Sequence, residues 1–180
     1  MTPKELDMLD HAAYRLLFDV RRSVRYHDKR AAFMERVHRI TNALTILLAG
    51  SVLFDMVRPG DTPGWLQALA LLGALLSVAD LVMGWTKIAG LHRDLQRRFA
   101  QLELRMVSGP AQGDCWINYG AERLMIEMDE PTPYLVLDTI CHNELLHAQG
   151  FGRESVHRKP VNTWQRLTCQ IWPWSQAYGH

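Results

Sequence analysis

The chain has 180 residues, with 20 basic and 19 acidic side chains and a formal net charge of +1. This near-neutral balance excludes general nucleic-acid binding, which needs a surplus of Lys and Arg. Plentiful and regularly spaced apolar residues exclude a disordered chain. The three cysteines are too few and too scattered for a disulfide framework and are typical of a reducing compartment. We expect no signal peptide, because residues 1–10 are rich in charge and have no apolar core.

The first part of the chain is expected to form one long helix. Apolar residues recur at helical spacing from residue 4 to residue 39, with charged residues between them. No Pro or Gly occurs between Glu5 and Ala49, so this helix can continue without a break into the segment that follows. We interpret residues 1–39 as a cytoplasmic helix.

Two apolar segments follow, and they are long enough to cross a bilayer. Residues 40–57 carry a single charge and would rise about 27 Å as a helix, near the roughly 30 Å of a hydrocarbon core. Residues 65–86 also carry one charge and are bracketed by Trp65 and Trp85, as expected for interfacial aromatics. The connection, residues 58–64, holds two Pro and two Gly and is expected to form a tight external turn. The pattern predicts a transmembrane helical hairpin.

The alternative is a soluble bundle with two buried helices. Such helices are usually shorter and keep a polar stripe, whereas apolar residues here occupy every face of both segments. Seven basic residues lie between residues 21 and 39, close before the first segment, and five lie between residues 87 and 105, close after the second, but the turn contains Arg58 alone. By the positive-inside rule both termini are then cytoplasmic, in a multi-pass protein of the inner (plasma) membrane.

Residues 87–107 are expected to continue the second span as a cytoplasmic helix with a near-heptad apolar stripe. Arg98 falls where the stripe needs an apolar residue, and Phe99 substitutes for it. Gly90 lowers helix stability slightly, and Ser108-Gly109-Pro110 ends the helix. Residues 108–180 form a small C-terminal helical region, with helices expected near 115–128, 134–149 and 161–171. The fold class predicted is therefore an all-α membrane protein, a two-helix transmembrane hairpin extended by long cytoplasmic helices.

Polar residues inside the spans are the first candidate site. Charge is costly in a bilayer, and folding the hairpin about Asp61 brings Asp80 close to Asn42 and Thr45. Asp80 either pairs with Asn42 inside the hairpin or lines an aqueous path in an oligomer. The pore-lining candidates are Asp80, Asn42, Thr45 and Thr41. Gly73 with Ser77, and Ala70 with Ala74, have the small-residue spacing that permits close helix contact.

A second group of residues is predicted to form a basic and histidine band at the inner membrane face. A response to pH or to lipid headgroups is the alternative to a merely interfacial role. The band consists of Arg25, His27, Arg36, His38, Arg39 and His92.

Catalytic chemistry is not expected. In Cys141-His142-Asn143-Glu144, adjacent helical residues diverge, so a Cys–His nucleophile is not assembled, and His142 and His147 are five residues apart rather than four. Packing by Cys141 and polar contacts by its three neighbours are the expected uses. Neither a metal site nor a phosphate-binding loop is found, and no cofactor is predicted.

Two groups of motifs occur along the chain: Val24 to Ala31, Phe33 and Arg36 to Arg39 before the first span, then Leu137-Asp138, Cys141 to Glu144 and Trp164 to Leu167. In these motifs the chain resembles the SLATT group of two-helix membrane proteins. The resemblance implies a pore-forming effector of a bacterial conflict or antiphage system, triggered by a partner protein and ending in membrane disruption. This chain resembles the effector portion alone, so a cytoplasmic partner would supply the trigger.

These observations predict an oligomeric inner-membrane pore, in contact with the lipid bilayer and self-associating, because two spans cannot enclose a channel alone. A holin-like phage protein and a non-conducting membrane scaffold are the alternatives. The aromatic residues Trp164, Trp172 and Trp174 would recruit a scaffold's partner, cover the helical core or rest on the membrane.

Overall fold

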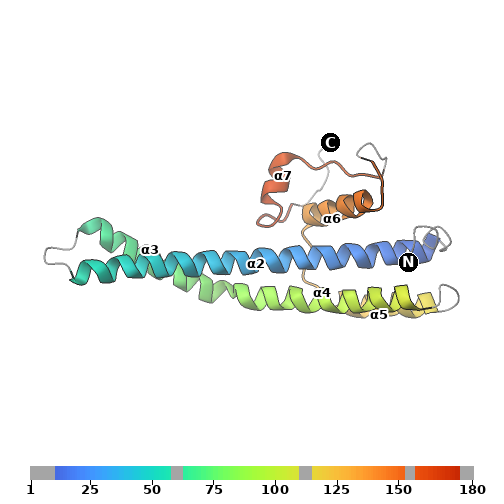
Figure 1. Cartoon of the computed structure of the whole chain (residues 1–180), viewed down its shortest axis with the longest axis horizontal. Helices are drawn as coiled ribbons and strands as arrows, with labels where there is room; N and C mark the ends of the chain where they lie inside the picture. The colour runs from blue at the N-terminus through green and yellow to red at the C-terminus, as the bar shows by residue number, and fades with distance from the viewer. Residues whose placement is uncertain (1–10, 58–62, 110–114, 153–156, 175–180) are drawn as a thin grey trace. The chain divides into compact units, whose positions relative to one another are not determined.

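The structure is a computed structural model of the whole chain, and it describes residues 11–57, 63–109, 115–152 and 157–174; the side chains of 54–57 lie outside that description. All of the regular elements in these ranges are helices (Figure 1). They are α2 (His11–Val57), α3 (Gly64–Met83), α4 (Trp85–Ser108), α5 (Cys115–Glu127), α6 (Leu135–Ala148) and α7 (Thr163–Thr168). The all-α prediction is confirmed for the described residues.

Helix α2 is a single unbroken element of 47 residues. Its length follows from the absence of Pro and Gly before Gly50, since no residue in that run removes a backbone donor or lowers helix propensity sharply. The predicted continuation of the first helix into the first apolar segment is therefore confirmed. Residues 1–10 and most of the predicted turn at 58–64 lie outside the described residues.

The prediction of one continuous helix from the second span to residue 107 is wrong. Gly84 adopts a left-handed conformation (φ 59°, ψ 45°) between α3 and α4. Its N–H still donates to the carbonyl of Asp80 at 3.0 Å, and its own carbonyl accepts from the N–H groups of Lys87 and Ile88. Glycine alone reaches this backbone region without a steric cost, so the helix is interrupted here and not at Gly90.

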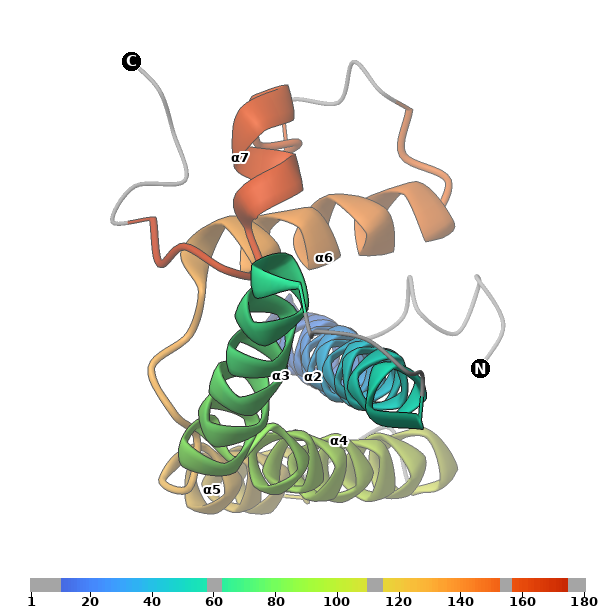
Figure 2. The ribbon, with the colours of Figure 1, turned by 90° about the vertical axis from the view of Figure 1, so that its left-hand side faces the viewer.

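The chain divides into two compact units, and the first comprises residues 1–30 and 92–180. In this unit α4 and α5 lie on one side of α2, and α6 and α7 lie on the other (Figures 1 and 2). The core between α2, α4 and α5 contains Ala13, Leu17, Val20, Leu95, Phe99, Leu102, Met106 and Ile126. Phe99 is fully buried, as its predicted place in the apolar stripe requires.

The C-terminal helices use a second face of α2. Phe18 packs with Leu145 and Leu146 of α6, and Tyr26 packs with Val136, Leu137, Cys141 and Cys169. Helix α6 ends before Gly150, whose φ is 90°. At the start of α7 the N–H of Asn162 donates to Oε1 of Gln165 at 3.1 Å, which closes one half of a capping box. This unit is thus a small helical assembly organised around the first half of α2.

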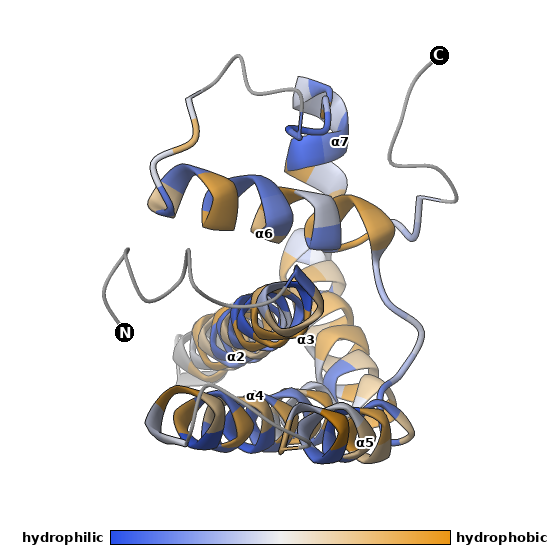
Figure 3. Cartoon of the chain, turned by 90° about the vertical axis from the view of Figure 1, so that its right-hand side faces the viewer, coloured by the Kyte–Doolittle hydropathy of each residue, from blue (hydrophilic) through white to orange (hydrophobic). Residues whose placement is uncertain are grey.

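The second unit, residues 31–91, exposes most of its apolar side chains. Helix α3 is mainly hydrophobic (Figure 3), yet Leu66 and Gly73 are its only buried residues. The described residues contain one helical run long and apolar enough to cross a membrane, Gly64–Ser108, and its most apolar stretch is 11% buried. The apolar segment of α2 includes residues 54–57, whose side chains are outside the description, so the first span of the predicted hairpin, residues 40–57, is not established here.

Candidate functional site

Asp80 of α3 lies in a polar chain inside the second unit. Its Oδ1 atom is 3.0 Å from Nδ1 of His38, and Nε2 of His38 is 3.0 Å from Nδ2 of Asn42. A carboxylate only accepts, so His38 donates from Nδ1 to Asp80 and, while neutral, accepts from the Asn42 amide at Nε2. The side chains of His38 and Asp80 are 29% and 19% exposed, so the pair is partly buried between α2 and α3.

The structure therefore places Asp80 near Asn42, but joins them through His38. From the sequence, Asp80 was expected either to pair with Asn42 or to line an aqueous path, and His38 was expected in the interfacial band. His38 precedes Asn42 by one helical turn, and its longer side chain reaches the carboxylate. Thr41 and Thr45 are half-buried, and the hydroxyl of Thr45 is buried without a hydrogen-bond partner in the part of the chain that the structure describes.

Helices α2 and α3 also approach closely at Gly73, in the same unit as this polar chain. A Cβ atom added to Gly73 would lie 3.2 Å from Cβ of Leu48. Gly73 is buried, which agrees with the predicted small-residue contact, whereas Ala74 and Ser77 are exposed. The pairing of residue 73 with residue 48 corresponds to a hairpin folded near residue 60, close to the predicted centre at Asp61.

Two histidines of the first unit form a buried pair. Nδ1 of His27 on α2 lies 2.9 Å from Nδ1 of His92 on α4, and Nε2 of His27 lies 2.7 Å from Oε1 of Glu130. The two side chains are 1% and 2% exposed, and the His27 ring also stacks on Phe99. His27 and His92 were predicted to lie in a band at the inner membrane face, but both are buried inside the first unit. Their 65-residue separation left no local signal of the pairing.

Burial is the main influence on the titration of His92. Desolvation, with the nearby His27 and Arg30, lowers the pKa of His92 to about 4. The His92 ring is therefore held neutral over most of the pH range.

The other members of the predicted band are on the surface or half-buried. Arg36 and Arg39 are exposed, and Nε of Arg39 donates to the carbonyl of Glu35 at 3.3 Å. Arg25 is half-buried and donates to the carbonyl of Arg21 at 3.4 Å. The structure does not gather these arginines with the buried histidines.

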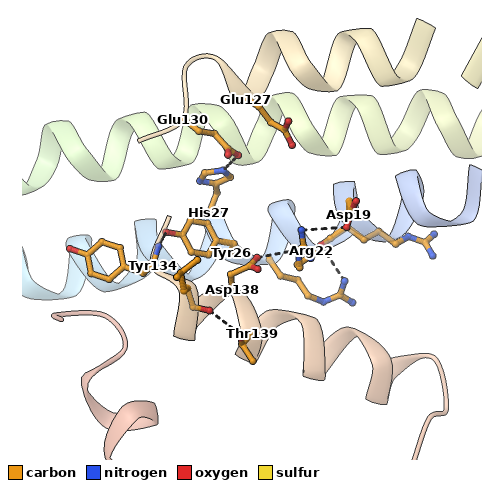
Figure 4. A network of polar contacts seen from close by, with 12 residues as sticks. Asp19, Arg22, Tyr26, His27, Glu127, Glu130, Tyr134, Asp138 and Thr139 are labelled. Carbon is orange, nitrogen blue, oxygen red and sulfur yellow. Dashed lines mark hydrogen bonds and ion pairs between the residues drawn. The ribbon is translucent and has the colours of Figure 1, made fainter. Parts of the chain in front are cut away.

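A network of polar contacts attaches α6 and its preceding segment to α2 (Figure 4). Arg22 lies between two carboxylates, 3.3 Å from Asp19 and 3.1 Å from Asp138. The N–H of Tyr134 donates to the hydroxyl of Tyr26 at 2.9 Å. The contacts of Arg22 with Asp138 and of Tyr26 with Tyr134 join segments far apart in the sequence, and they were not predicted from it.

The Cys141-His142-Asn143-Glu144 motif is used for packing and polar contacts, as predicted. Cys141 is fully buried, and burial raises the pKa of its thiol to about 12. Asn143 binds Lys159 through both backbone groups, and Glu144 lies 2.7 Å from Nζ of Lys29. His142 lies 3.2 Å from the carbonyl of His157. In the part of the chain that the structure describes, no group of three His, Cys, Asp or Glu side chains is arranged to hold a metal ion.

No protein-family model, curated protein or solved structure matches this chain. The function is therefore inferred from the contacts within each unit. The SLATT resemblance stays a prediction.

Proposed function

We propose that this chain is an integral membrane protein whose α2 and α3 insert as a two-helix hairpin and self-associate into a pore. The observation that carries the proposal is the exposure of apolar side chains around α3. Leu71, Leu75, Val78, Leu81 and Val82 are between 57% and 82% exposed.

This exposure argues against a soluble core helix. Such a helix is mostly buried by its own protein, whereas the apolar stretch of Gly64–Ser108 is 11% buried. Exposed apolar surface of this extent needs lipid or another protein against it. In α2, Ile46, Leu47 and Leu53 are likewise 71%, 70% and 63% exposed, which supports a second spanning segment beside α3.

The polar chain of Asp80, His38 and Asn42 supports a conducting role. Ionisable groups in a membrane helix normally face a partner or a water-filled path, because exposure to lipid is costly. Asp80 has a partner in His38, but Asn42 is exposed and the Thr45 hydroxyl has no hydrogen-bond partner among the described residues. Self-association that turns this side of the hairpin inward would surround a lumen with Asp80, His38, Asn42, Thr45 and Thr41.

Membrane insertion is tested first. The chain expressed in bacteria should remain in the membrane pellet after extraction with alkaline carbonate. Cys115 is half-buried in the first unit and should react with a membrane-impermeant maleimide only after the cells are permeabilised, if that unit is cytoplasmic. Release of the chain by carbonate would contradict the proposal.

Conduction is tested in vesicles that contain the purified chain, with a voltage-sensitive dye. Asp80→Leu should lower the ion flux at least tenfold at equal inserted protein, and His38→Leu should have a similar effect, because the two side chains form one unit. Asp94→Leu is the matched control, since Asp94 lies on α4 in the first unit and pairs with Arg97. Equal flux from wild type and Asp80→Leu would contradict a lumen at this site.

The resemblance to SLATT proteins extends the proposal to a defence effector of the bacterial inner membrane. A cytoplasmic partner that senses infection would then open the pore. Its test is the plating efficiency of phage on cells that carry the chain together with its neighbouring genes, with Asp80→Leu as the inactive variant.

A non-conducting scaffold is the second candidate. The observation that favours it is an exposed apolar face in the C-terminal segment, where Trp164, Leu167, Ile171 and Trp172 are between 63% and 71% exposed. A scaffold should bind its partner equally well with and without Asp80→Leu and should give no flux in vesicles.

A further inference from the structure

The buried pair of His27 and His92 lies where two helices leave the first unit. Residues 1–30 and 92–180 form that unit, so His27 precedes its boundary on α2 by three residues and His92 is its first residue on α4. Glu130, in the segment after α5, holds the far side of the His27 ring. The contact therefore joins three segments of the chain at this boundary.

The number of protons on the pair follows from its partners. Glu130 accepts from Nε2 of His27, so neutral His27 presents a bare Nδ1, and His92 donates to it from its own Nδ1. One added proton leaves the contact intact, because a single imidazolium can still face a neutral ring with Glu130 as its counter-ion. A second added proton places two N–H donors and two positive charges face to face at 2.9 Å.

Among the charged and titratable groups around the pair, Arg30 opposes that second proton. Arg30 on α2 is 4% exposed and adds a buried positive charge, and Tyr26 stacks edge-on against both histidine rings. On α4, Arg93 pairs with Asp28 of α2 at the exposed edge, and Phe99 covers the His27 ring. The Glu130 carboxylate contacts the pair through Nε2 of His27.

We propose that His27 and His92 form a proton-operated clasp, which holds α2 against α4 while at most one of the rings is charged and releases when both are. Release frees Nδ1 of both rings to bind water, so the open form takes up one more proton than the closed form. The clasp itself does not depend on the proposed pore. Because α2 and α4 lead into the hairpin, release of the clasp would also alter conduction. This second effect rests on the proposed function.

The desolvated state of His92 sets the pH range of the effect. Its pKa is lowered to about 4 in the closed form, and an exposed ring titrates near 6.5. Between these values the closed form binds fewer protons, so the open fraction should rise as the pH falls, by up to about tenfold per pH unit.

The experiment measures the separation of α2 and α4 in the full chain in lipid nanodiscs. Nitroxide labels at Arg25→Cys and Arg97→Cys, with Cys115→Ser, report the distance by pulsed electron resonance between pH 7 and pH 4. Wild-type His92 should give a second, longer distance that gains population as the pH falls. His92→Gln should stay closed throughout, because its amide can donate to His27 but does not take up a proton.

His147→Gln is the matched control, since His147 is exposed on α6 and should leave the response of the wild type unchanged. A single distance at all pH values in the wild type would overturn the proposal, and so would an equal acid response in His92→Gln. If His92→Gln does not fold, His92→Phe replaces it, with the same expected loss of pH response. Flux recorded with the same variants in vesicles separates the two proposals, because a clasp that opens without altering flux contradicts gating alone.

Discussion

The guanidinium of Arg30 on α2 donates a 2.7 Å hydrogen bond to the backbone carbonyl of Gln170, just after α7. Its Cζ atom also lies 4.1 Å from the centre of the Tyr134 ring. Arg30 is 4% exposed, so both contacts are made away from water. A buried cation on α2 thus holds the chain segment that follows α7 and the residue that precedes α6.

Arg30→Leu should destabilise the first unit by about 2–4 kcal/mol. The substitution leaves the Gln170 carbonyl without its donor and removes the cation–π contact. Denaturant unfolding in detergent, followed by the fluorescence of the C-terminal tryptophans, measures the change. Arg97→Ala is the control, because the Arg97 side chain is 70% exposed and its loss should cost less than about 0.5 kcal/mol.

Gly73→Leu should weaken the contact between α2 and α3. The added side chain meets Cβ of Leu48, which lies 3.2 Å from the position of a Cβ at residue 73. Overpacking of this kind costs about 1–3 kcal/mol. The thermal unfolding midpoint of the chain in detergent should fall.

Gly50→Leu provides the comparison for that variant. Gly50 also lies in the second unit, on α2, but a Cβ there meets nothing within 4 Å. Its replacement should leave the midpoint unchanged or raise it, because leucine has the higher helix propensity. An equal fall in both variants would mean that Gly73 has no special role in packing.

Cys141 should resist thiol reagents in the folded chain. Its side chain is fully buried, and desolvation raises its pKa to about 12, so almost no thiolate is present near neutral pH. Labelling with N-ethylmaleimide at pH 8, followed by mass spectrometry, should modify Cys115 and spare Cys141 and Cys169. All three should react in denaturant; modification of Cys141 without denaturant would contradict its place in the core.

Tyr26 should make the first unit sensitive to alkaline pH. Burial raises the pKa of Tyr26 to about 12, so the folded chain keeps a phenolic proton that the unfolded chain releases near pH 10. Its contribution to stability is present below pH 10 and is lost as the pH rises toward 12. Tyr26→Phe should reduce this alkaline loss and cost about 1 kcal/mol at pH 7, because the N–H of Tyr134 loses its acceptor.

Unfolding curves between pH 8 and pH 11.5 test that prediction. Tyr14→Phe is the matched control: Tyr14 also lies on α2, but its hydroxyl donates to the Gln149 side chain and is not the acceptor of a backbone N–H. An unchanged alkaline slope in Tyr26→Phe would show that other groups cause the loss.

Local signals in the sequence predicted the helices well, because helical periodicity and the positions of Pro and Gly act over a few residues. The continuity of α2 and the burial of Phe99 are examples. The break at Gly84 was missed because two glycines lie six residues apart in the same run, and propensity does not tell which of them ends a helix.

The polar sites were predicted less well, because they depend on contacts between distant segments. Asp80 was placed within one turn of its partner, since hairpin folding alone fixes that register approximately. The pairing of His27 with His92, and that of Arg22 with Asp138, required the packing of whole helices. The local sequence around a histidine or arginine on a charged helix does not show whether its side chain makes a buried contact or is solvated.

The two helical runs that lead through the second unit differ in stiffness. Helix α2 runs on to Val57 with uninterrupted backbone hydrogen bonding, so its second half, which carries His38 and Asn42, is stiff. The other run contains a joint at Gly84, where torsion can be absorbed by a single residue. Within the second unit, His38 and Asn42 therefore turn together, whereas rotation at Gly84 reorients residues 85–91 without moving Asp80.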